Sequence, residues 1–172
     1  MLRSPAMDWE IVKTLPHPTP SLVIDGTTWR VVDEITMLDA ASESRHAFAI
    51  HDAKDQYNER STQKYPDGTV VTDTGRTQLE GTFAFTALGL APGRPVVILR
   101  RIDYIMGNYE LEVSVDGAPA GTSACVGADR AHRWRNWPIH IAGAHVASSM
   151  KVRLKSLTLR RDVHMFHVWI YQ

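Results

Sequence analysis

The chain has 172 residues, of which 44% are apolar and 22% charged, and its formal net charge is zero. This length favours a single domain with one core, and without a run of ~20 apolar residues the sequence predicts no membrane-spanning helix. The neutral charge balance disfavours a nucleic-acid-binding protein, and the single cysteine, Cys125, rules out an intramolecular disulfide framework.

The N-terminal residues contain no apolar stretch of the ~7 to 15 residues typical of a secretory signal, so a cytoplasmic location is favoured. Three prolines lie between Lys13 and Ser21. Because proline interrupts regular structure, residues 1–21 are predicted to form an N-terminal arm.

Strand patterns begin directly after this arm. In SLVIDGTTWRVV, the dipeptide Asp25-Gly26 separates two short apolar strands and supplies the positive φ angles of a hairpin turn. A short helix is expected over Leu38–Arg45. The segment 52–73 is polar and poor in branched apolar residues, so it is predicted to be a long loop.

The clearest strand pattern covers Asn108–Val115, where apolar and polar residues alternate strictly before an Asp116-Gly117 turn. Such alternation indicates one buried and one solvated face. Within Met150–Arg160 the alternation slips by one residue near Lys155, which predicts a β-bulge. Other strands are expected at Gly81–Thr86, Val96–Ile102, Asn136–Ile141 and Met165–Tyr171.

Short strands separated by proline- and glycine-containing segments are typical of an antiparallel sandwich. The sequence therefore predicts an all-β chain, folded over residues 1–172 as a single antiparallel β-sandwich with little helix.

From about Gly81 onward the chain resembles a known module. The segments LRRIDYIMGNYELEVSVDGAPAGT, RWRNWPIHIAGAHVASSMKVRLKSL and FHVWIY are similar to the jelly-roll domain of glycoside hydrolases related to difructose-anhydride synthase, which act on furanoside linkages. More loosely, they resemble galactose-binding-like carbohydrate-binding modules. The resemblance implies a jelly-roll sandwich and a carbohydrate ligand. Those enzymes place acidic catalytic residues near the junction of two jelly rolls, whereas this chain has room for one, so the activity does not carry over.

The C-terminal strand is the first candidate binding surface. Its alternation places Phe166, Val168 and Ile170 on one face and His167, Trp169 and Tyr171 on the other. If the aliphatic face is buried, three rings are displayed in a row. Because sugars stack their C–H faces on such rings, this row is a candidate saccharide platform. The alternative is that an N-terminal strand or another subunit covers the rings.

A second candidate surface lies around RWRNWP. Trp134 and Trp137 are three residues apart, so an extended chain directs them to opposite faces, one to the core and one toward a groove beside Arg135. Tyr104 and Asn108 flank a loop where side chains can converge on a ligand. Asn108 is equally well suited to stabilise a turn.

Catalytic carboxylates are less clearly indicated. Glu110 and Glu112 share the solvated face of one strand about 7 Å apart, within the range for glycosidic cleavage, but a solvated strand face explains them equally well. The other carboxylates considered for such a pair are Glu59, Asp73, Glu80 and Asp103. No catalytic residue is assigned.

Eight histidines raise the question of a metal, but the chain has no HxH pair of the kind that a cupin-like metal site requires. A structural calcium ion stays open, although Asp52, Asp55 and Glu59 lack a diagnostic spacing. No cofactor is expected.

These observations predict a non-catalytic carbohydrate- or glycoconjugate-binding jelly-roll module that self-associates. A furanosidase-like hydrolase with a site completed between subunits and a capsid-like assembly protein are the alternatives. The candidate ligand-binding residues are Trp134, Arg135, His167, Trp169, Tyr171, Tyr104 and Asn108.

Overall fold

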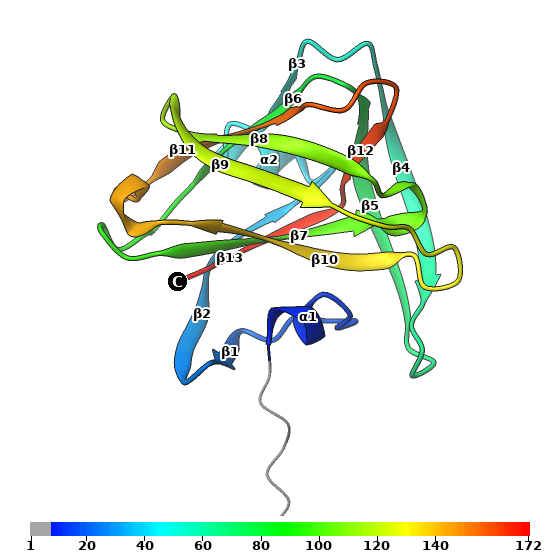
Figure 1. Ribbon diagram of the computed structural model, residues 1–172, viewed down its shortest axis with the longest axis horizontal. Helices are drawn as coiled ribbons and strands as arrows, with labels where there is room; N and C mark the ends of the chain where they lie inside the picture. Colours follow the sequence, from blue (N-terminus) through cyan, green and yellow to red (C-terminus); the bar gives the residue numbers. More distant parts are fainter. Residues whose placement is uncertain (1–7) are drawn as a thin grey trace, which may run out of the picture.

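Two five-stranded antiparallel sheets face each other in the computed structural model, which describes residues 8–172 (Figure 1). The first sheet has the order β1 (Ser21–Ile24), β2 (Thr27–Thr36), β13 (His167–Tyr171), β7 (Val96–Asp103) and β10 (Trp134–Ile141). The second has the order β3 (Ala49–His51), β6 (Thr82–Ala87), β11 (Met150–Ser156), β8 (Tyr109–Val115) and β9 (Ala118–Cys125). The predicted jelly-roll β-sandwich is confirmed.

A third sheet of three strands closes one end of the sandwich. Its order is β12 (Asp162–Met165), β5 (Val70–Leu79) and β4 (Asp55–Lys64). The helical elements are short: α1 (Trp9–Val12), α2 (Ala40–Arg45) and the two 3-10 helices η1 (Tyr104–Met106) and η2 (Gly143–His145). None of the helices in residues 8–172 is long and apolar enough to cross a membrane.

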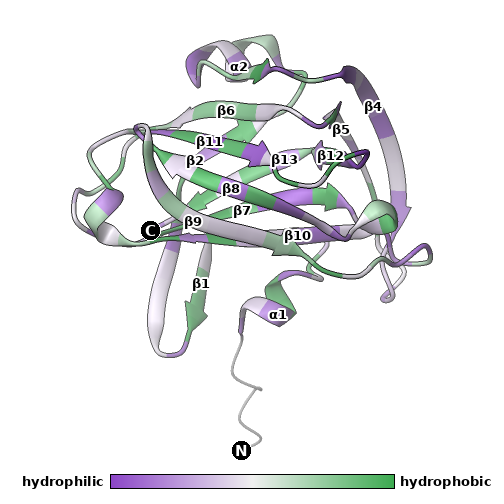
Figure 2. Ribbon diagram, turned by 45° about the horizontal axis from the view of Figure 1, so that its top comes forward, coloured by the Kyte–Doolittle hydropathy of each residue, from purple (hydrophilic) through white to green (hydrophobic). Residues whose placement is uncertain are grey.

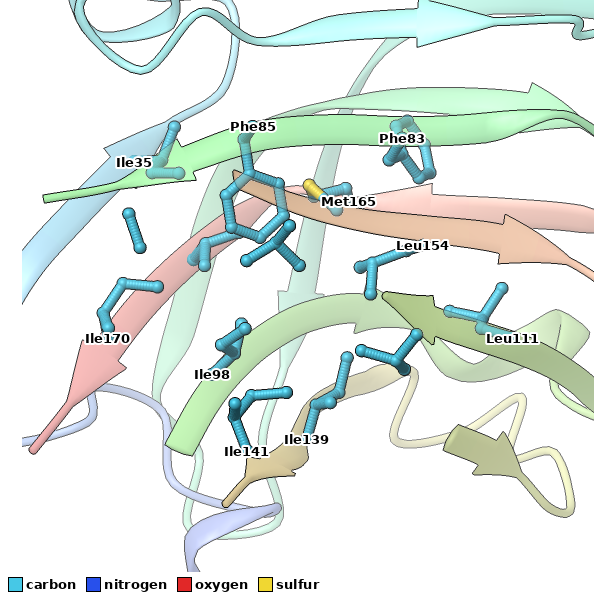
Figure 3. Packing of buried hydrophobic residues seen from close by; sticks show 14 of the residues in the cluster. Ile35, Phe83, Phe85, Ile98, Leu111, Ile139, Ile141, Leu154, Met165 and Ile170 are labelled. Atoms are coloured by element: carbon cyan, nitrogen blue, oxygen red, sulfur yellow. The ribbon is translucent and has the colours of Figure 1, made fainter. Parts of the chain in front are cut away.

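The main core lies between the two large sheets, where the inward side chains of their strands meet (Figure 3). In β8 the predicted alternation holds, with Tyr109, Leu111, Val113 and Val115 buried. Ile98 of β7 packs within the same cluster as these side chains. Removing this apolar surface from water provides most of the driving force for closing the sandwich.

The N-terminal segment packs against the outer face of the first sheet. Val12 of α1 is buried in a second apolar cluster together with Leu22, Val97 and Leu99. The backbone N–H of Asn136 in β10 donates to the carbonyl of Lys13 at 2.9 Å. Residues 8–20 of the predicted arm therefore form part of the fold, and residues 1–7 lie outside the described part of the chain.

The prediction of a long loop over residues 52–73 is wrong. Most of this segment belongs to a hairpin in which β4 and β5 pair over ten residues, joined by a turn closed by Tyr65 N–H to Thr69 O at 2.8 Å. Most residues of the two strands are polar, and Figure 2 shows β4 in purple and near-white. The hairpin is held together by backbone hydrogen bonds between its strands. Its side chains therefore do not need the alternation of apolar and polar residues by which strands are recognised in a sequence.

The predicted β-bulge near Lys155 is also wrong. Strand β11 ends at Ser156, and Leu157 and Leu159, the apolar residues after the predicted bulge, are 45% and 73% exposed. The register shifts instead lie at Val113/Ser114, between β8 and β9, and at Ile170/Tyr171, between β13 and β2. The change of alternation marks the end of the strand. The predicted short helix, by contrast, is present as α2.

Candidate functional site

The three predicted rings of the C-terminal strand are not displayed to solvent. Val168 and Ile170 enter the main core, so His167, Trp169 and Tyr171 do face the other way, as the alternation indicates. The N-terminal segment covers that face, however, leaving Tyr171 0% and Trp169 8% exposed. Tyr171 donates its hydroxyl to the carbonyl of Thr19 at 2.7 Å. The prediction of an open ring platform here is wrong, because the chain supplies its own cover.

Phe166 also departs from the expected pattern. It lies between β12 and β13 and packs against Trp134 rather than with Val168 and Ile170. The ring centroids of Phe166 and Trp134 are 4.6 Å apart in an edge-on arrangement. Trp134 is 1% exposed and donates its indole N–H to the carbonyl of Val71 at 3.1 Å, so it is a core residue and not a ligand platform.

Asn108 has the structural role that was its alternative interpretation. Its backbone adopts a φ of 64°, and its side-chain oxygen accepts a hydrogen bond from the N–H of Gly127 at 2.8 Å. Asparagine tolerates this left-handed conformation better than most residues do. Asn108 thus fixes the junction between η1 and β8 and does not line the groove described next.

A groove of about 540 Å³ lies beside β9 and β10, the neighbouring edge strands of the two large sheets. It brings together two of the predicted ligand-binding residues, Tyr104 and Arg135, with Trp137 of β10. This volume is in the usual range for ligand pockets. The remaining lining residues are Glu10, Lys13, Thr14, Ala124 and Val126.

Within the groove, four side chains form a column in which two stacked rings lie between two cations. The Tyr104 and Trp137 rings are stacked, with centroids 5.6 Å apart and planes inclined by 27°. The ammonium of Lys13 lies 4.3 Å from the Trp137 ring centre, and the guanidinium carbon of Arg135 lies 5.3 Å from the Tyr104 ring centre. Cations in these positions are attracted by the negative faces of the rings.

Short local contacts hold Tyr104 in place. Asp103 accepts a hydrogen bond from the N–H of Ile105 at 3.0 Å, which caps η1, and accepts a second from Arg133 Nε at 3.0 Å. The Tyr104 hydroxyl donates to the carbonyl of Val126 on the far side of the groove. Burial raises the pKa of Tyr104, so this hydroxyl stays protonated and able to donate at neutral pH.

Arg135 is fixed with equal precision. Its Nη1 donates to the carbonyls of His132 and Trp134 at 2.6 and 2.8 Å, and its Nη2 lies 3.2 Å from Asp129. Hydrogen bonds from the backbone N–H of His132 and of Ala131 hold the pKa of Asp129 below its usual value. The carboxylate therefore remains charged and anchors the guanidinium beside the Tyr104 ring.

The opposite wall of the groove comes from the N-terminal segment. Lys13 forms an ion pair with Glu10 at 2.6 Å, and Thr14 donates its hydroxyl to the carbonyl of Ile11 at 2.9 Å. These residues were not predicted to be part of a site, because they lie in the expected arm. No local pattern connects Lys13 to Trp137, which is 124 positions later; only the docking of α1 brings them together.

The carboxylates considered for catalysis do not assemble into a site in this groove. Glu110 and Glu112 are exposed on β8. Asp103 is buried and engaged by Arg133, and Glu59 accepts a hydrogen bond from Thr77 on the neighbouring strand at 3.3 Å. Across residues 8–172, no group of three or more potential ligands is arranged to hold a metal ion.

Comparison with known proteins gives likenesses in shape. A family 6 carbohydrate-binding module of lichenase 5A from Cellvibrio mixtus, solved with cellotriose, is 13% identical, with a TM-score of 0.47 over 83% of this chain and 98% of that one. The C-terminal family 6 module of a laminarinase from Zobellia galactanivorans is 8% identical, with a TM-score of 0.46 over 73% and 99%. A family 35 module from Clostridium thermocellum is 12% identical, with a TM-score of 0.41 over 72% and 96%.

No protein-family model and no curated protein sequence matches the chain. The three structural neighbours named above are carbohydrate-binding modules, whereas the resemblance to difructose-anhydride synthase stays a prediction. Identities of 8–13% and TM-scores of 0.41–0.47 indicate a likeness of fold alone.

Proposed function

We propose that this protein is a non-catalytic carbohydrate-binding module whose ligand occupies the groove between β9 and β10. The observation that carries the proposal is the stacked pair of Tyr104 and Trp137 in the groove, with Lys13 and Arg135 beside the rings. Rings and charged donors in one depression match the two halves of a sugar, its apolar C–H surface and its hydroxyl groups.

Five of the lining residues have a part in such a complex. The faces of the Trp137 and Tyr104 rings are occupied by each other and by the two cations, so the partly exposed edges of these rings would contact the C–H surface of a sugar. Lys13 supplies ammonium donors for hydroxyl or ring oxygens, and the Glu10 carboxylate accepts from sugar hydroxyls. Arg135, with its Nη1 already bound to two carbonyls, mainly holds the Tyr104 ring in position.

The pre-formed state of the groove supports binding without large rearrangement. Tyr104 is tied through its hydroxyl to Val126, and Arg135 is tied to the 129–134 segment by three hydrogen bonds. Side chains that are already ordered lose little entropy when a ligand arrives, which favours affinity.

The test is a glycan array followed by calorimetry with the strongest oligosaccharide. Trp137→Leu and Tyr104→Leu retain apolar bulk against the core but remove the rings. Each is expected to weaken binding about five- to tenfold, since a ring contact contributes about 1–1.5 kcal/mol. Tyr57→Leu, which removes an exposed ring on β4, is the matched control and should bind normally.

Two results would count against the proposal. An array without any reproducible ligand would remove its basis, as would a sugar whose affinity is unchanged in both groove variants. Thermal melts of each variant must accompany the calorimetry, because Trp137 also packs against the main core.

Self-association stays a prediction. It is expected from apolar and aromatic residues on faces that one pair of sheets cannot bury, and the N-terminal segment buries part of that surface, including Trp169 and Tyr171. Light scattering at tens of micromolar measures it directly.

A further inference from the structure

Arg100 lies in the middle of β7 with its side chain directed between the two large sheets. Ile98 and Ile102, two positions before and after it, belong to the main core, and side chains two positions apart in a strand share a face. Arg100 is 0% exposed. Its neighbours across the first sheet are Val168 of β13 and Trp137 of β10. A guanidinium group therefore sits inside the apolar interior of the sandwich.

This guanidinium is only partly satisfied by the protein. Its Nη2 donates to the hydroxyl of Tyr109 at 2.7 Å, but Nε and Nη1 have no hydrogen-bond partner. Within the described part of the chain, no carboxylate lies within 4 Å of Arg100 to form an ion pair. The three N–H groups of Nε and Nη1 thus have no protein acceptor, and the positive charge has no opposing charge beside it.

The adjacent Arg101 lies on the opposite face of β7, and all three of its side-chain nitrogens have partners. Its Nε donates to Asn136 at 3.2 Å, its Nη1 lies 3.2 Å from Asp73, and its Nη2 donates to the carbonyl of Pro16 at 2.5 Å. Arg101 has both an opposing charge and an acceptor for each nitrogen. Arg100, one residue earlier and equally buried, has neither.

The two weakly acidic groups near Arg100 do not supply the missing charge. Tyr109 and Cys125 face each other across β8 and β9. Burial raises the pKa of both side chains, so both remain neutral at physiological pH.

We propose that Arg100 forms an internal anion site that takes a monovalent inorganic anion of halide size. A buried charge is strongly destabilising unless it is paired, and an anion provides both the opposing charge and an acceptor for the free N–H groups. A halide is close in size to a water molecule, and protein interiors commonly hold species of that size next to polar groups. Because Arg100 is 0% exposed, a small anion is expected there rather than a large one.

The first experiment is crystallographic. Crystals of the full chain grown with sodium bromide are expected to show an anomalous bromine peak within hydrogen-bonding distance of Arg100 Nε or Nη1. Water density at these nitrogens with no anomalous signal would overturn the proposal.

The second experiment measures stability in solution at constant ionic strength, with chloride or bromide replacing gluconate. At a halide concentration ten times the dissociation constant, the melting temperature of the wild type is expected to rise by about 4 °C. Arg100→Met, which keeps the length of the side chain and removes its charge, should lose this halide dependence. Arg153→Met, which changes a partly exposed arginine of β11, is the matched control and should retain the halide dependence.

If Arg100→Met does not fold, Tyr109→Phe provides the second variant, because it removes the one protein acceptor and keeps the charge. The halide-dependent rise should then be at least as large as in the wild type. The inference would be contradicted if the melting temperatures of the wild type, Tyr109→Phe and Arg153→Met were each the same in halide as in gluconate.

Discussion

The groove between β9 and β10 and the outer face of β13 are built from similar side chains but differ in what covers them. In the groove, Trp137 stacks on Tyr104 with Lys13 alongside. On β13, Trp169 stacks on His167 with ring centroids 4.3 Å apart, and the Arg101 guanidinium carbon lies 5.0 Å from the Trp169 ring centre. The groove stays open, whereas the N-terminal segment covers most of the face of β13 and leaves only a smaller depression beside Trp169.

Aromatic rings and cations in a row therefore do not by themselves identify a binding surface. What decides is whether another part of the chain buries the rings, because burial of aromatic area stabilises the fold by the same contacts that would bind a ligand. Three substitutions would break or sharpen this distinction.

The largest effect is expected from a charge placed under the N-terminal cover. Val12→Asp puts a carboxylate in the apolar cluster with Val97 and Leu99, where it has no partner. We expect a loss of about 4 kcal/mol or more and a melting temperature lower by about 10 °C. Ile11→Asp, one residue earlier and 38% exposed, is the control and should change stability little. Comparable melts for the two variants would mean that the cover is not part of the folded structure.

A smaller effect separates the two tryptophans. Trp169→Ala should lower stability by about 3 kcal/mol, because it removes a buried ring, while leaving the affinity for a sugar in the groove unchanged. Trp137→Leu should show the opposite pattern, with lost affinity and a smaller change in melting temperature. Calorimetry and thermal melts on both variants test this. Loss of sugar binding in Trp169→Ala with an intact fold would instead place the ligand on β13.

The smallest effect concerns pH at the border of the covered face. The hydrogen bond from His167, 2.6 Å away, holds the pKa of Glu34 below its ordinary value of 4.5, against the opposing effect of burial. A lowered carboxyl pKa stabilises the fold above the ordinary value, and this contribution disappears as pH falls through the folded-state pKa. Glu34→Gln should therefore be less stable than the wild type by about 0.5 kcal/mol at pH 6, and this difference should shrink as the pH falls below 4.5.

The control for this titration is Glu110→Gln, an exposed carboxyl on β8 that forms no ion pair within residues 8–172. Melting curves from pH 3 to pH 7 should show no pH-dependent difference between this variant and the wild type. A difference for Glu34→Gln that grows as the pH falls would contradict the assigned sign.

Much of the sandwich could be predicted from local sequence, and most of the site could not. The alternation in β8 and the turns at Asp25-Gly26 and Asp116-Gly117 are local signals, and all of these elements are present, with positive φ angles at both turns. Strands β4 and β5 were not predicted, because their pairing depends on backbone hydrogen bonds between residues that are mostly polar.

The position of the groove depends on contacts between distant segments. The sequence indicated correctly that Trp134 and Trp137 face opposite ways, but not which one is buried, since Phe166 and Val71 approach Trp134 from far along the chain. Similarly, no periodicity reveals that Lys13 reaches Trp137. Local patterns orient side chains, and only the tertiary arrangement determines which of them meet.

The N-terminal segment has two attachments with different consequences. Its apolar side anchors it on the first sheet, and its polar side forms one wall of the groove. A ligand that contacts both Lys13 and Trp137 would stabilise the docked position of this segment. Ligand binding should therefore slow protease cleavage between α1 and β1. The N-terminal segment that covers the face of β13 would thereby report on binding in the groove.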